Sequence, residues 1–279
     1  IESEWDYCLV LDACRYDVFS EVYDEYLDGD LEKRRSLGSS TPEWASKTLV
    51  GDLDIAYFSS NPFINSKGIP LNELKWGASC DYEWTATDHL ADVIDIWQEG
   101  WDDDLGTVPP ESLTEAFETH HDIVERRERT VLHYMQPHAP YLGRGEGGKL
   151  TTIREGIKKQ KNGDDDGGGG VLAAVGDRVR PAVESALDGS SLAMKVGMML
   201  ELDKAEILSN GTRETAMEYH EENLRIALES VAALIDRLDG DIVVTADHGE
   251  AFGEQGVWEH HIETPIPPLI EVPWLEVTS

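Results

Sequence analysis

The stretch VVTADHGEAFGE, residues 243–254, passes from an apolar run into acids, a histidine and glycines. Asp247 and His248 can bind one divalent cation together, one through oxygen and the other through nitrogen, if the backbone turns sharply between them. Gly249 permits such a turn because glycine has no Cβ. The alternative is a plain turn that ends a strand. The segment therefore predicts either one side of a metal site or a strand terminus.

Further candidates lie near the start of the chain. Asp12 directly follows the apolar run YCLVL and is either a metal ligand or a helix cap. Ser39, Ser40 and Thr41 stand where a helix is expected to begin, so one of them is either an N-cap or a nucleophile. A metal would lower the pKa of such a hydroxyl, and helix N–H groups would help to hold an anionic ester.

Three histidines add polar groups away from these segments. His138 stands between the two prolines of QPHAPY, where it could bind an anion or protonate a leaving group. His260 and His261 follow Trp258. The pair is either a surface feature or brings one imidazole to a substrate or metal.

The elements that must position these residues alternate between strands and helices. Such alternation predicts a mostly parallel sheet with helices on both faces, in which ligands bind beyond the carboxyl ends of the strands. The polar candidates all follow expected strands, so we expect them to meet at one edge of the sheet. Residues 258–274, WEHHIETPIPPLIEVPW, contain several prolines and are expected to form a loop and an edge strand. Strands are expected over 7–12, up to about 37, within 54–63, over 130–135 and over 241–247, and helices over 15–27, from 41, over 110–129 and over 213–238.

The length of 279 residues predicts a single α/β domain over 1–279. An insertion is expected over 144–212, because the alternation of elements stops there. Its Gly/Asp-rich part, 162–170, is expected to be flexible.

The net charge is −33, from 56 acids against 23 bases spread along the chain. This charge argues against nucleic acid and anionic membranes as partners, because both attract basic surfaces. Dispersed acids with few lysines are typical of proteins from a salt-rich cytoplasm, where repulsion is screened. We therefore predict a halophilic, haloarchaeal source. The charge predicts nothing about the oligomeric state.

The cysteine pattern and the lack of a membrane span or secretory signal predict the cellular location. The three cysteines, Cys8, Cys14 and Cys80, show no metal-type spacing and are expected to be reduced thiols. No apolar run reaches the ~18 residues of a membrane span. No secretory signal is evident. These features predict a cytoplasmic protein without a membrane span.

Three motifs in this order resemble the sulfatase and alkaline phosphatase superfamily. VLDACRYD resembles its D-x-x-R-x-D start, QPHAPY is similar to its H-x-P-[YF] loop, and TADHGEAFGE is similar to its DHG segment. The resemblance spans residues 7 to about 265 and implies an αβα sandwich of alkaline-phosphatase-like type. It also implies a divalent metal and a covalent ester intermediate.

The resemblance further implies roles for individual residues. Asp12, Asp247 and His248 would bind the metal together with the oxygen of Thr41. Thr41 would be the nucleophile, because the lipoteichoic-acid-synthase-like branch uses a threonine followed shortly by an acid, here Glu43; Ser40 is the second choice. The residues expected to contact the substrate are His138, His260 and Arg15.

Departures from the superfamily pattern narrow the prediction. The [CS]-x-P-x-R motif that yields formylglycine is absent, which makes sulfate the less favoured substrate. The P-D-x-x-G-H type loop of two-metal members is also absent, so we expect one ion: Mn²⁺, Mg²⁺ or Ca²⁺.

We therefore predict a metal-dependent hydrolase or transferase acting on small-molecule, glycan or lipid phosphate esters. Two alternatives are a sulfuric ester hydrolase without formylglycine and a non-catalytic superfamily member that binds a ligand. A two-metal sugar-phosphate mutase is less favoured.

Overall fold

Seven strands form one mixed sheet in the computed structural model, which describes residues 4–74, 80–142, 153–157, 160 and 202–278. The strand order is β2-β9-β6-β1-β5-β3-β4. Pairing is parallel from β6 to β4, whereas β9 is antiparallel to both β2 and β6. The strands of this sheet are β1 (Tyr7–Leu11), β2 (Gly29–Arg35), β3 (Leu53–Ser59), β4 (Leu90–Asp95), β5 (Arg129–Tyr134), β6 (Ile242–Ala246) and β9 (Glu271–Val277).

The centre of the sheet consists of the apolar runs that the sequence marks as buried strands. β1 lies between β5 and β6, and its last residue, Leu11, is in register with Tyr134 and Ala246. These three strands therefore end at the same level. Asp12 and Asp247 are the next residues along β1 and β6, so the register brings both carboxylates to one edge.

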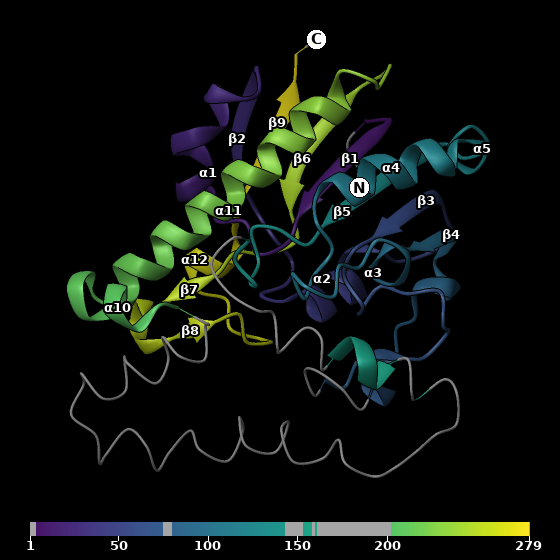
Figure 1. Ribbon diagram of the computed structural model, residues 1–279. Helices are drawn as coiled ribbons and strands as arrows, with labels where there is room; N and C mark the ends of the chain where they lie inside the picture. Colours follow the sequence, from purple (N-terminus) through teal and green to yellow (C-terminus); the bar gives the residue numbers. More distant parts are fainter. Residues whose placement is uncertain (1–3, 75–79, 143–152, 158–159, 161–201, 279) are drawn as a thin grey trace.

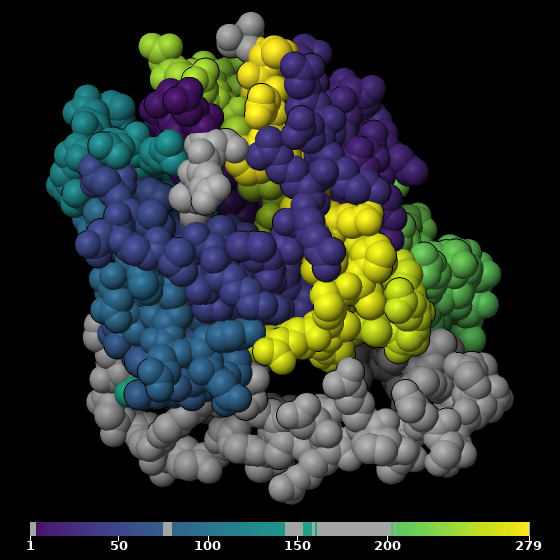
Figure 2. Space-filling model, turned by 180° about the vertical axis from the view of Figure 1, so that it is seen from behind, coloured from purple at the N-terminus to yellow at the C-terminus, as the bar shows by residue number. Residues whose placement is uncertain are grey.

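Helices cover both faces of the sheet. Trp44 of α2 packs against the His133 ring with centroids 5.9 Å apart, whereas the adjacent Tyr134 lies beside Ser230 of α11. Neighbouring residues of a strand point to opposite faces, so α2 and α11 lie on opposite sides. Figure 1 shows α11 crossing the front of the sheet, and α11 is largely hidden in the view from behind in Figure 2. The helices are α1 (Tyr16–Val22), α2 (Thr41–Thr48), α3 (Ile96–Glu99), α4 (Glu111–Thr119), α5 (His121–Val124), α10 (Lys204–Asn210), α11 (Thr212–Ile235) and α12 (Pro267–Ile270).

The predicted fold class is confirmed, but the prediction for the last strand is wrong. β9 is an inner strand between β2 and β6, although it contains Pro273. The carbonyl of Pro273 accepts a hydrogen bond from the Thr245 hydroxyl at 2.7 Å. The β6–β9 pairing ends at Thr245 and Trp274. The N–H and C=O of one strand residue point to the same side, so the missing N–H of Pro273 faces β6, just beyond the end of the β6–β9 pairing. It costs no strand hydrogen bond there, although Pro273 stays paired with Lys33 of β2.

Two smaller expectations also need correction. The helix predicted over 110–129 is two helices, α4 and α5, because the backbone of His120 between them has φ −106° and ψ 30°, outside the helical range. The edge strand β4 was not predicted, because its alternation of buried and exposed residues is weak.

The insertion predicted over 144–212 lies mostly outside the described residues, including its Gly/Asp-rich part, 162–170. In the described portion of the chain, none of the helices is both long and apolar enough to span a bilayer.

Candidate active site

Two carboxylates and an imidazole meet beyond the ends of β1 and β6. His248 Nε2 lies 3.8 Å from Asp12 Oδ1 and 3.4 Å from Asp247 Oδ2. All three side chains are buried. His248 Nδ1 is 2.8 Å from the carbonyl oxygen of Gly249, which can only accept, so Nδ1 carries the hydrogen and Nε2 presents a lone pair to the carboxylates. The structure therefore brings the predicted metal ligands together.

Unsatisfied atoms at this edge fit a cation. Among the described residues, Asp12 Oδ1 and His133 Nε2 are buried without a hydrogen-bond partner. His133 Nε2 lies 3.7 Å from Asp12 Oδ2 and 3.8 Å from Asp247 Oδ2. Buried polar atoms without partners are costly unless an ion or water satisfies them. The donor set of carboxylates, imidazole and hydroxyl therefore suits a divalent metal.

The pKa shifts of the carboxyl and imidazole groups also fit a metal site. Burial and the nearby Asp247 carboxylate raise the pKa of Asp12 well above its usual value. Burial opposes ionisation of Asp247, but His248 and His133 offset it and lower the pKa of this carboxyl. Burial also lowers the pKa of His248, and it lowers that of His133 to about 4. Both imidazoles are therefore neutral at neutral pH, the form that binds metals.

Of the candidate hydroxyls, that of Thr41 faces the carboxylates. Its Oγ1 donates to Asp247 Oδ2 at 2.8 Å and lies 3.3 Å from His248 Nε2. The Ser39 hydroxyl lies 2.7 Å from Glu43 Oε2 instead. Ser40, the second choice for the nucleophile, has a buried hydroxyl with no hydrogen-bond partner in the described part of the chain. Thr41 is therefore the one of the three predicted hydroxyls that is hydrogen-bonded to a predicted metal ligand.

Glu43 does not face the predicted metal site. Its Oε2 accepts hydrogen bonds from the backbone N–H groups of Ser39 at 2.9 Å and Glu263 at 3.0 Å. Lys47 forms an ion pair with Oε1 at 2.5 Å. Glu43 thus joins the start of α2 to the loop that follows His260.

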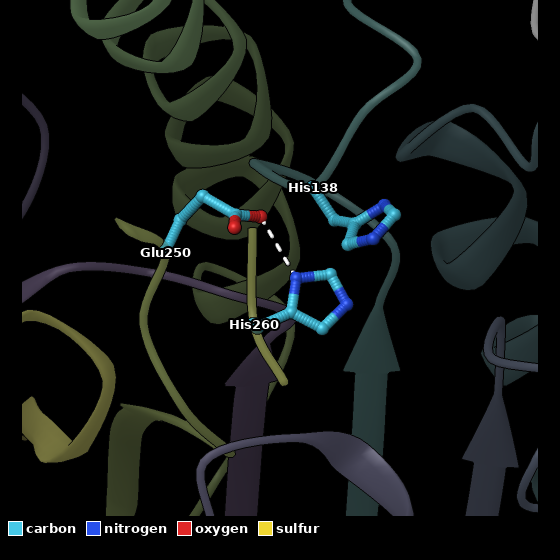
Figure 3. Close-up of side chains that lie close together, drawn as sticks. All are labelled: His138, Glu250 and His260. Carbon is cyan, nitrogen blue, oxygen red and sulfur yellow. Dashed lines mark hydrogen bonds and ion pairs between the residues drawn. The ribbon is translucent and has the colours of Figure 1, made fainter. Parts of the chain in front are cut away.

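A second group lies beside the first: His138, Glu250 and His260 (Figure 3). His260 Nδ1 and Glu250 Oε2 are 2.9 Å apart. The His260 ring lies 4.9 Å from that of His138 and 4.7 Å from that of His248, between centroids. His138 and His260 are partly exposed, whereas Asp12 and Asp247 are buried. The two partly exposed imidazoles therefore lie on the solvent-facing side of the buried carboxylates.

Glu250 allows a second interpretation of this group. A carboxylate and two imidazoles, each with a ligand atom within 4.8 Å of the others, could also hold a cation. The predicted count of one metal remains a prediction.

Arg15 was predicted to contact the substrate, but its guanidinium is bound to other residues of the protein. Its guanidinium contacts Asp17 at 2.6 Å, Glu254 at 2.9 Å and the carbonyl oxygen of Glu250 at 2.9 Å. Only 3% of Arg15 is exposed. These bonds hold the 250–254 segment in place, and substrate binding by Arg15 stays a prediction.

Gly249 is required for a reason other than a left-handed turn. A Cβ at this position would lie 2.0 Å from the carbonyl oxygen of Pro268. Its N–H donates to the carbonyl of Leu269 at 2.8 Å. The close approach of α12 therefore explains the glycine and fixes the backbone directly after His248.

Three residues at the site were not predicted from the sequence: Asn61, His133 and Glu250. Asn61 Nδ2 donates to Asp12 Oδ2 at 2.5 Å and to Thr41 Oγ1 at 3.1 Å. His133 is a polar residue inside an apolar run, which could have marked it. Asn61 lies two residues beyond the end of β3, the same edge as the other candidates.

Comparison with known proteins gives structural matches alone. No protein-family model matches the chain, and no curated protein matches it significantly. The soluble domain of lipooligosaccharide phosphoethanolamine transferase A from Neisseria meningitidis matches with a TM-score of 0.52 and 11% identity, covering 97% of this chain and 75% of that one. The C-terminal periplasmic domain of phosphoethanolamine transferase EptC from Campylobacter jejuni matches with a TM-score of 0.51 and 13% identity, covering 96% and 77%.

At these identities the likeness concerns the fold. The cytoplasmic location predicted from the sequence gains no support from a periplasmic domain and stays a prediction. Both matched proteins are members of the superfamily whose motifs the sequence resembles. The chain therefore has the αβα fold of the sulfatase-like and alkaline phosphatase superfamily, as its motifs predict.

Proposed function

We propose that this protein is a metal-dependent hydrolase or transferase of phosphate esters that works through a covalent phosphoryl ester on Thr41. The observation that carries the proposal is the position of the Thr41 hydroxyl. Its oxygen lies 2.8 Å from Asp247 Oδ2 and 3.3 Å from His248 Nε2. A buried hydroxyl beside a metal-binding set is the arrangement of an activated nucleophile.

The cation would be held by Asp12, Asp247 and His248 together with the Thr41 oxygen. When bound, such an ion supplies positive charge that polarises a phosphoryl oxygen and favours the alkoxide. Oxygen-rich ligation with one imidazole suits Mn²⁺, Mg²⁺ or Ca²⁺. His133 is a further nitrogen donor beside both carboxylates.

The residues of the chain account for the remaining steps. The Thr41 oxygen forms a bond to phosphorus while the bond from phosphorus to the leaving alcohol breaks. The Thr41 proton passes to Asp247 Oδ2, to which it is already hydrogen-bonded. His138 and His260, on the partly exposed side, bind phosphoryl oxygens or protonate the leaving oxygen. Water or an acceptor alcohol then attacks phosphorus and gives its proton to the histidine that protonated the leaving oxygen. The bond from phosphorus to the Thr41 oxygen breaks, and Thr41 regains its proton from Asp247, which gives hydrolysis or transfer.

The proposed nucleophile supports phosphate esters as the substrate class, and the names of the similar proteins suggest which of them to test first. An unmodified threonine without a formylglycine motif favours phosphate esters over sulfate esters. Both structurally similar domains belong to proteins named phosphoethanolamine transferases. A glycan or lipid phosphodiester is therefore the first class to test, with small-molecule phosphate esters next.

The net charge of −33 opposes the approach of an anionic ester. At molar salt the Debye length falls to ~3 Å, so this repulsion is screened beyond contact distance. Assays are therefore best made at high salt.

The test is a panel of aryl phosphates, phosphodiesters, phosphonates and sulfates with Mn²⁺, Mg²⁺ and Ca²⁺ at high salt. We expect Thr41→Ala to abolish turnover and the phosphorylated peptide that mass spectrometry should find in the wild type. Ser40→Ala is the matched control, because it removes the neighbouring hydroxyl, and it should stay active. Turnover by Thr41→Ala would refute the proposal. Absence of turnover by metal-loaded protein on every ester would favour a ligand-binding role.

A further inference from the structure

We infer that Asn61 sets the direction of the Thr41 hydroxyl and supports its oxygen as the nucleophile. The inference rests on the proposed function, since it assigns a partner to the proposed nucleophile. Asn61 lies in the loop after β3, and 3% of it is exposed. Its amide spans the gap between Asp12 and Thr41.

The orientation of the Asn61 amide is fixed by the backbone. The N–H of Phe63 donates to Oδ1 at 2.9 Å. A backbone N–H can only donate, so the atom that receives it must be the amide oxygen. Nδ2 therefore faces the site and donates to Asp12 Oδ2 at 2.5 Å and to Thr41 Oγ1 at 3.1 Å. The Ser59 hydroxyl donates to the Asn61 carbonyl at 2.8 Å and holds the main chain as well.

The hydrogen bond from Asn61 determines which lone pair of the Thr41 hydroxyl stays available. A hydroxyl has one hydrogen and two lone pairs. The hydrogen goes to Asp247 Oδ2 at 2.8 Å, and one lone pair accepts from Asn61. His248 Nε2, 3.3 Å away, cannot donate to the other pair while its hydrogen is on Nδ1. One lone pair thus remains for a cation, and loss of the hydrogen to Asp247 frees another for the bond to phosphorus.

The amide also suits the charge that develops. When Thr41 loses its proton to Asp247, the Asn61 hydrogen bond becomes a bond to an anion, which is stronger than one between neutral groups. Loss of one such preorganised donor typically costs ~10²–10³ in rate. Asn61 touches the reacting oxygen and is therefore a catalytic residue of the proposed reaction.

The test compares two asparagines of one loop. Asn61→Ala and Asn61→Asp remove the donor, and Asn65→Asp is the matched control. Asn65 is also buried but donates to the carbonyl of Pro62 instead, at 2.8 Å. We expect both Asn61 variants to form the Thr41 ester ~10²-fold more slowly. Their affinity for Mn²⁺, measured by titration calorimetry, should change far less. Asn65→Asp should behave as the wild type.

Several outcomes would overturn the inference. Ester formation by Asn61→Ala at the wild-type rate would do so. Loss of Mn²⁺ binding with the rate restored at saturating Mn²⁺ would also do so, because Asn61 would then act through the cation. An inactive Thr41→Ala beside fully active Asn61 variants would refute this inference alone, whereas an active Thr41→Ala would refute the proposed function.

A measurement that leaves Asn61 intact guards against variants that fail to fold. In the NMR spectrum, the side-chain amide signals of Asn61 should shift when Thr41→Val removes the hydroxyl, while those of Asn65 should not. Unchanged Asn61 signals would show that the two side chains do not interact, and the inference would fall.

Discussion

Thr41 donates its hydroxyl hydrogen to Asp247 at 2.8 Å, although the two residues stand 206 positions apart in the chain. The start of α2 and the end of β6 bring them together. The contact joins the proposed nucleophile directly to a predicted metal ligand. Substitution of Thr41 tests nucleophilic attack, and substitution of Asp247 tests metal binding.

Asp247→Asn should weaken divalent metal binding by more than ~100-fold, because even groups that only support a metal ligand cost 10–100-fold when replaced. The amide keeps an oxygen that can accept from the backbone N–H of Ala13, so the fold should persist. Mn²⁺ titration calorimetry measures the loss. Glu271→Gln removes the same charge at a partly exposed site paired with Lys33, and it should leave the affinity unchanged.

We expect one bound ion per chain, measured by elemental analysis after dialysis. His138, Glu250 and His260 are the place where a second ion would bind. Two ions in the wild type, with one lost in His260→Asn, would contradict the prediction of a single metal and would change the role of both histidines from substrate contact to ligation.

Gly249→Ala should destabilise the protein by about 1–3 kcal/mol, the usual cost of forcing extra atoms into a packed site. The new Cβ would meet the Pro268 carbonyl oxygen at 2.0 Å, and α12 or the backbone after His248 must move. Denaturant unfolding at high salt measures the change. Gly256→Ala is the control: its φ is +79° and no atom lies within 4 Å, so it carries the strain of that φ without the clash.

Stability should fall as the pH drops below about 6.5, the ordinary pKa of histidine. Burial, together with the positive charge of Arg15, lowers the pKa of His220 to about 3. Burial lowers that of His133 to about 4. Between pH 6.5 and the lowered pKa of each histidine, the unfolded chain binds a proton that the folded chain does not bind. The free energy of unfolding should therefore fall by about 1.4 kcal/mol per pH unit for each such histidine.

His220→Leu tests the assignment, because it removes one of these groups. Its ring packs against Phe252 with centroids 5.4 Å apart, a setting that tolerates an apolar side chain. The variant should show a shallower decline in stability between pH 6.5 and 4.5 than the wild type, in unfolding curves at constant salt. An unchanged slope would show that His220 is not excluded from protonation in the folded state.

Dilution from molar salt to ~0.1 M should unfold the protein, because the Debye length then grows from ~3 to ~10 Å and the surface acids repel one another. The net charge of −33 motivates this expectation. Near-ultraviolet circular dichroism across a salt series would follow the loss of packing. Constant stability over the series would contradict the predicted halophilic source.

The sequence predicted the parts of the site that follow strands. Asp12 and Asp247 each come directly after a strongly apolar run, and parallel strands end at a common edge. Thr41 is singled out by the family resemblance, because a hydroxyl at the start of a helix is either an N-cap or a nucleophile. The structure separates the hydroxyls by their contacts, which depend on how α2 packs.

Other features needed tertiary contacts that no local pattern shows. The polar His133 inside an apolar strand marks an unusual position, but only the placement of Asp12 and Asp247 shows that it lies beside the predicted metal ligands. Arg15 belongs to a recognised motif, yet its ion pair with Glu254 depends on a loop far along the chain. Pro273 led to the prediction of an edge strand, because a proline cannot donate a strand hydrogen bond. The sequence does not show that the pairing with β6 ends at the residue next to Pro273, before the proline is reached.

The inner position of β9 has a consequence for how the molecule is made. β2 pairs with β9 and with no other strand in the part of the chain that the structure describes, so β2 cannot be paired until the distant β9 has left the ribosome. Contacts between such distant segments slow folding, because a long loop must close before they form. Nascent chains of this protein should thus leave the backbone N–H and C=O groups of β2 without a strand partner until synthesis has passed Val277.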